Sequence, residues 1–125
     1  GQQENAIEMA WSGSGDTDLV FTHAPLDLTR EANAGFCLAM TLARGWGRHD
    51  APNIALVCRS GRQELGNVFD LPIVERSRSA RIVEIPLKDL VKNGMDLSCV
   101  EGVALWSDKP ARLVLSHLGF AMGRG

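Results

Sequence analysis

The sequence predicts an all-β domain, a two-sheet antiparallel β-sandwich of the jelly-roll type, for this chain of 125 residues. Eight short segments alternate apolar and polar residues with the period of two that a strand requires. Glycine, proline and small polar residues separate these segments, as turns do. The longest helical pattern is about one turn, so a helical bundle and an α/β fold are both excluded. With 45% hydrophobic residues, the chain can build a single core without a disulfide scaffold.

The first half of the chain supplies four predicted strands, at 6–11, 18–23, 36–43 and 53–59. Segment 36–43 is the longest apolar one, with large side chains on one face and small ones on the other. Small residues on the second face predict a central strand that is packed on both sides. In the first segment, Trp11 shares a face with two other apolar residues, so we expect it in the core.

The second half supplies four more strands, predicted at 65–71, 80–85, 102–107 and 111–120. Polar residues at 60–63 predict a turn before the first of them, and the charges at 75–79 predict a loop after it. Pro86 lacks a backbone donor, and the apolar spacing of residues 87–94 predicts one short helical turn that ends at Asn93-Gly94.

Composition and charge exclude several classes of partner. The formal net charge is −2, which gives no positive excess for a phosphate backbone, so nucleic acid is not an expected partner. No apolar run approaches the roughly 20 residues of a membrane span, so we expect no membrane partner either. The chain starts at Gly1 instead of a methionine, and we expect a single domain, 1–125, that is cut from a longer chain.

Three stretches carry a resemblance to a known family. They are DLTREANAGFCLAM at 27–40, APNIALVCRSG at 51–61 and IVEIPLKDLVKNGMDLSCVEGVAL at 82–105. In this order they resemble the C-terminal galactose-binding-like domain of bacterial family 3 glycoside hydrolases, the exo-glucanases and β-glucosidases. That domain often has a Cys-Gly pair followed closely by another cysteine. This chain has Cys58-Arg59 and no cysteine shortly after, so a local disulfide is not expected.

The resemblance implies a noncatalytic module that follows a catalytic barrel and a second α/β domain, both outside these 125 residues. Its implied partners are a β-glucan-type oligosaccharide and the catalytic domains of the same polypeptide. Its implied location is the periplasm or the extracellular medium. The module either binds carbohydrate near the catalytic cleft or, as the alternative, serves as a structural brace between domains or subunits. The isolated chain is expected to be inactive.

The residues themselves agree with the absence of a catalytic site. A glycosidase needs two carboxylates about 5 to 10 Å apart. The acidic candidates lie scattered over turns, where such groups are usually solvated: Asp16, Asp18, Asp50, Glu64 and Asp70. The three histidines have no short metal-ligand spacing, and no serine or cysteine lies in a nucleophile-elbow motif. We therefore expect no catalytic residue and no metal-dependent chemistry. An enzyme in its own right would reveal itself by hydrolysing an aryl β-glucoside.

The loop 44–50 is the first candidate carbohydrate site. Sugar rings present apolar C–H faces, so their sites combine an aromatic plate with hydrogen-bonding groups. Trp46 lies between two glycines and is the candidate plate. The candidate polar frame around it consists of Arg44, Arg48, His49 and Asp50. The alternative is that Trp46 caps the edge of the sandwich or docks on the absent catalytic domain.

Glu84 and Trp106 form a second candidate surface. Each residue alternates along its strand with apolar residues that are expected in the core, so both side chains are expected to point outward. If the two strands are neighbours, Glu84 and Trp106 would line one groove. The alternative is that Trp106 simply covers its sheet.

The three cysteines lie in or beside apolar strands, which predicts buried thiols, although an exported protein could form one bridge. The expected cofactor is none. A structural calcium ion is the one alternative, with Asp16, Asp18 or Asp27 as its candidate ligands.

Overall fold

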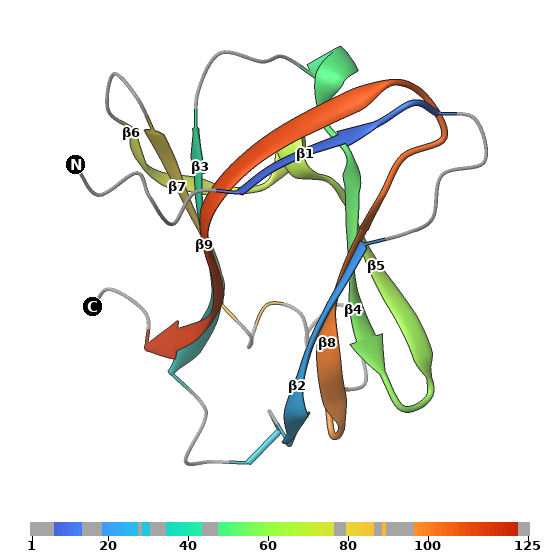
Figure 1. Ribbon diagram of the computed structural model, residues 1–125. Helices are drawn as coiled ribbons and strands as arrows, with labels where there is room; N and C mark the ends of the chain where they lie inside the picture. The colour runs from blue at the N-terminus through green and yellow to red at the C-terminus, as the bar shows by residue number, and fades with distance from the viewer. Residues whose placement is uncertain are drawn as a thin grey trace.

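The computed structural model describes residues 7–13, 19–27, 29–30, 35–43, 48–76, 80–86, 89 and 97–122. In these residues the chain forms nine strands in two antiparallel sheets, which Figure 1 shows as separate layers. Successive strands pass repeatedly from one sheet to the other, as in a jelly roll. The predicted all-β sandwich is confirmed.

The larger sheet has five strands, in the order β1-β9-β3-β7-β6. Their bounds are Ile7–Trp11 for β1, Ala111–Met122 for β9, Phe36–Ala43 for β3, Ala80–Pro86 for β7 and Ile73–Arg76 for β6. Strand β3 pairs with β9 on one side and with β7 on the other, so the prediction of a central strand is confirmed.

The smaller sheet has four strands, in the order β2-β8-β4-β5. Their bounds are Leu19–Leu26 for β2, Val100–Trp106 for β8, Asn53–Cys58 for β4 and Gly61–Asn67 for β5. Two single-turn 3₁₀ helices flank β4 and β5: η3, Arg48–Asp50, precedes β4, and η4, Val68–Asp70, follows β5. Among the described residues, no helix has the length and hydropathy needed to cross a membrane.

The core lies between the two sheets. From β3, the side chains of Leu38, Met40 and Leu42 are buried there, and Trp11 is only 4% exposed, as predicted. On the opposite face of β3, Cys37 and Ala39 are buried as well. The small residues on that face therefore do mark a strand that is covered on both sides.

Strand β5 begins four residues earlier than predicted. It covers 61–67, so the predicted turn at 60–63 is wrong, as is a strand that continues to residue 71. Its polar residues are tolerated because β5 is an edge strand, half of whose side chains face solvent. The strand ends at Asn67, whose Oδ1 accepts a hydrogen bond from Phe69 N at 2.8 Å and thereby starts η4.

Two further predictions about strand boundaries are also wrong, again at sheet edges. Strand β6 occupies Ile73–Arg76, where the charges at 75–79 predicted a loop, and it pairs with β7. Strand β2 continues through Pro25 to Leu26. An edge strand accepts proline because one side of its backbone needs no ladder hydrogen bond. The helical turn predicted at 87–94 lies outside the described residues except for Asp89, which is helical.

All three cysteines are thiols, as expected: Cys37 and Cys58 are buried and Cys99 is half-buried. Since no disulfide constrains the unfolded chain, dithiothreitol is expected to leave the thermal midpoint unchanged within about 1 °C. Parallel melts with and without the reductant test this. A drop of several degrees in the reduced sample would show that a bridge forms.

Candidate functional site

The loop that carries the first candidate site ends in a well-anchored segment. Residues 44–47 lie outside the described part of the chain, and this includes Arg44 and Trp46; the side chain of Arg48 is outside it too. His49 and Asp50 belong to η3, and both are exposed. The next two residues are buried and held by backbone carbonyls: Ala51 O accepts from Asn67 Nδ2 at 2.9 Å, and Pro52 O accepts from Val68 N at 2.9 Å.

Trp106 lies at the same end of the sandwich as η3, the described end of this loop. It is the last residue of β8 and pairs with Asn53, the first residue of β4, which in turn pairs with Asn67 of β5. Helix η3 ends only three residues before Asn53, and Figure 1 shows it at the end of the sheet where β4 begins. Trp106 and helix η3, separated by more than 50 residues in the sequence, therefore lie at the same end of the four-stranded sheet.

The Trp106 ring lies on the outward face of the four-stranded sheet. Its neighbour Leu105 points into the core with no exposed surface, so Trp106 points the other way, and it is half-buried. The guanidinium carbon of Arg62 lies 5.9 Å from the centre of the ring. This is within the range of a cation–π contact.

The contact between Trp106 and Arg62 crosses strand β4. Trp106 is on β8 opposite Asn53, and Arg62 is on β5 opposite Val57. Ala55 lies midway between these two positions on the same outward face, and both it and its β8 partner Ala104 are fully buried. Two alanines on an outer face are buried only if larger side chains cover them. The Trp106–Arg62 contact therefore spans the strand that carries Ala55, on the same outward face.

This arrangement has the chemical parts of a carbohydrate site. The indole supplies an apolar plate, while Asn53, Arg62 and Glu64 supply donors and acceptors around it on the same face. Arg62 and Glu64 were not among the predicted frame residues, because β5 was placed too late in the sequence. Arg62 and Glu64 are two residues apart, so a strand predicted at 61–67 would have placed both side chains on the same face.

Glu84 lies far from Trp106 in the fold. It is on β7, opposite Ala39, and points outward from the five-stranded sheet because Val83 and Ile85 are buried. Trp106 points outward from the other sheet. The predicted groove shared by the two residues is therefore wrong, since they lie on opposite outer faces of the sandwich. The parity of each strand predicts which side chains point outward, but it carries no information about which sheet the strand joins.

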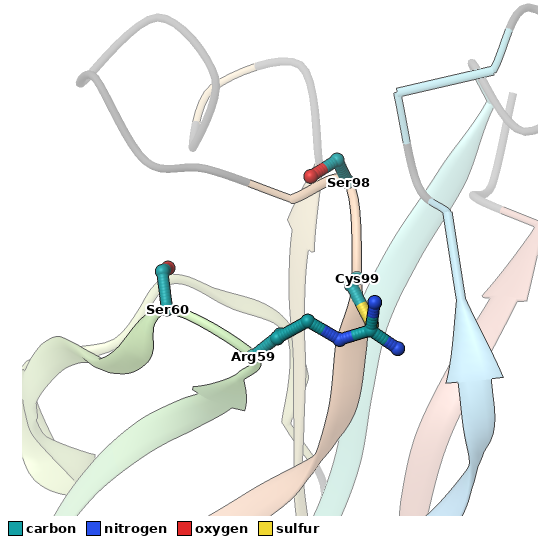
Figure 2. A pocket seen from close by; sticks show the side chains of 4 residues that line it. All are labelled: Arg59, Ser60, Ser98 and Cys99. Atoms are coloured by element: carbon teal, nitrogen blue, oxygen red, sulfur yellow. The ribbon is translucent and has the colours of Figure 1, made fainter.

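A pocket opens at the other end of the four-stranded sheet. It has a volume of about 310 Å³ and is lined by Arg59, Ser60, Ser98 and Cys99, the side chains drawn in Figure 2. Arg59 follows the last residue of β4, and Cys99 precedes the first residue of β8. The backbone N–H of Arg59 donates to the carbonyl oxygen of Cys99 at 3.0 Å, which joins the two walls.

Comparison with known proteins decides the family. The family model Exop_C, described as galactose-binding domain-like, matches residues 1–120. The chain belongs to this family. The galactose-binding-like resemblance that the sequence suggested is thereby confirmed, and the match extends over all but the last five of the 125 residues. A search of curated proteins and a search of solved structures found no match.

The acidic residues of this galactose-binding-like domain do not converge in its described part. Asp50, Glu64 and Asp70 are exposed, whereas Asp16 and Asp18 lie outside the described residues. Asp27 Oδ1 accepts hydrogen bonds from the backbone N–H and the hydroxyl of Thr29 in a local turn. No group of three histidine, cysteine or acidic side chains in the described ranges could hold a metal ion. A structural calcium ion stays a prediction.

Proposed function

We propose that this domain is a noncatalytic carbohydrate-binding module that binds a neutral β-glucan-type oligosaccharide at the Trp106 end of the sandwich. The supporting observation is the outward, half-buried indole of Trp106, flanked by polar side chains, in a member of a galactose-binding-like family. The pyranose C–H face would stack on the indole, and its hydroxyls would bond to Asn53, Arg62 and Glu64. A sugar that stacks on the indole would have to displace the exposed Arg62 guanidinium from the ring.

We further propose that the domain belongs to a family 3 glycoside hydrolase of the β-glucosidase or exo-β-glucanase type, located in the periplasm or secreted. The three ordered stretches at 27–40, 51–61 and 82–105 support this parentage. In this proposal the catalytic carboxylates lie in other domains of the polypeptide, and this chain contributes none of them.

A structural brace is the second candidate function, and one observation favours it. Large apolar side chains are exposed on two edge strands, Ile7 on β1 at 51%, and Val20 and Leu26 on β2 at 43% and 37%. Edge strands also present unpaired backbone groups to which another domain can add. In this account the same surface would contact the catalytic domains, and no sugar would bind.

Isothermal titration of the domain with cello- and laminari-oligosaccharides tests the binding function. Trp106→Ala is expected to weaken binding by at least about tenfold, because an aromatic anchor carries a large share of the affinity at a small site. Trp106→Phe keeps a ring and is expected to retain part of the affinity. Trp46→Ala is compared in the same series, because its loop ends beside Asn53.

Val114→Ala serves as the matched control, since Val114 is half-buried on the other sheet. Thermal melts confirm that each variant is folded. Unchanged affinity in Trp106→Ala would remove this residue from the site. Absence of binding by the unmodified domain at millimolar ligand would favour the structural brace.

A further inference from the structure

The pocket at the β4–β5 turn concentrates polar groups that the Trp106 site does not use. Figure 2 shows Ser60 on the turn after β4, Ser98 on the segment that leads into β8, and the Arg59 side chain extending toward Cys99. Arg59 is exposed, and its guanidinium has no ion-pair or hydrogen-bond partner among the described residues. The four residues line one pocket, with the Arg59 guanidinium beside Cys99 and the Ser60 and Ser98 hydroxyls at its other edges.

These groups favour an anion that accepts several hydrogen bonds. A guanidinium presents a planar fork of N–H donors that matches the two oxygens of a carboxylate, and serine hydroxyls can donate to the same group. Asp27, which follows β2 at this end of the sheet, accepts hydrogen bonds from Thr29. A volume of about 310 Å³ is at the small end of the range for ligand sites, which suits one sugar unit and not an extended chain.

We propose that this pocket binds the carboxylate of a uronic acid, so that the domain recognises acidic as well as neutral saccharides. The choice of a sugar acid rests on the proposed carbohydrate-binding function, whereas the choice of a carboxylate rests on Arg59 and the two serines. Arg59 pairs with the carboxylate, Ser60 and Ser98 bond to it or to ring hydroxyls, and the ring lies over the half-buried Cys99.

Two ligands that differ in a single group test the charge. Methyl β-glucuronide has a carboxylate where methyl β-glucoside has a hydroxymethyl group, and only the glucuronide is expected to bind detectably to the Trp106→Ala variant in a titration at low salt. Arg59→Gln should weaken its binding by about tenfold or more, because a charge-assisted pair is lost. Arg112→Gln removes an exposed positive charge from strand β9 and is expected to leave the affinity unchanged.

The thiol of Cys99 reports binding at the pocket itself. Cys37 and Cys58 are buried, so a thiol reagent is expected to modify the half-buried Cys99 first. Saturating glucuronide should slow this reaction, whereas the glucoside and acetate at the same concentration should not. Equal protection by the glucoside or by acetate would overturn the proposal. Unchanged glucuronide affinity in Arg59→Gln would overturn it as well.

The two sites can fail separately. Trp106 lies at the opposite end of β8, so Trp106→Ala is expected to leave glucuronide binding and Cys99 protection intact. If neutral oligosaccharides do not bind but the glucuronide does, the proposed Trp106 site fails while the pocket stands. If neutral oligosaccharides bind and the glucuronide does not, the pocket fails alone.

Discussion

Replacing Gly13 by alanine is expected to destabilise the domain by about 2–5 kcal/mol. Gly13 has a φ of +83°, which costs a residue with a Cβ about 1–2 kcal/mol. That Cβ would also overlap the backbone of Lys109 and Pro110 in the turn between β8 and β9. The turn cannot easily yield, because the Ser107 hydroxyl donates to Lys109 O and accepts from Lys109 N. Overpacking of this kind typically adds 1–3 kcal/mol.

Gly61→Ala is the matched control for this variant. Gly61 also has a positive φ, +126°, but nothing lies within 4 Å of the position of an added Cβ. It is expected to lose only the backbone contribution, about 1–3 kcal/mol for such a sparsely populated conformation. Urea unfolding followed by tryptophan fluorescence compares the two. Equal losses in both variants would show that the contact of Gly13 with the turn does not contribute.

Leu113→Ala is the second variant with a large expected effect. Leu113 lies on β9 in the core, without exposed surface, and removing its side chain leaves a cavity that costs about 2–5 kcal/mol. Its neighbour Val114 points outward and is half-buried, so Val114→Ala should cost less than about 1 kcal/mol. Chemical denaturation of both variants provides the measurement. Comparable losses would contradict the assignment of the inner face of the five-stranded sheet.

The sequence is most informative where a strand is central. The separation of large from small side chains over 36–43 predicts both the bounds and the position of β3, because both faces of that strand are buried. Edge strands lack this constraint. The polar segments that form β5 and β6 have the composition of loops, and Pro25 in β2 is a residue that usually ends a strand. Edge strands tolerate both because one side of their backbone is solvated.

The candidate site is predictable only in part, for a related reason. Alternation along one strand predicts that Trp106 points outward. Its position at the same end of the sheet as helix η3 and its contact with Arg62 depend on the register of β4 with β8 and β5, which a single sequence does not reveal. The same missing information led to the incorrect pairing of Glu84 with Trp106. The pocket at Arg59 depends on two segments about 40 residues apart and has no local motif.

The most direct test of the carbohydrate-binding role follows the indole N–H signals of the domain by NMR during titration with a cello- or laminari-oligosaccharide. The chain has three tryptophans, so three signals can be assigned with single Trp→Phe variants. Trp11 is buried in the core, and its signal is expected to stay in place as an internal control. A saturable shift of the Trp106 signal is expected. A titration to millimolar oligosaccharide that leaves the Trp106 signal unmoved would contradict a sugar site at this end of the sandwich.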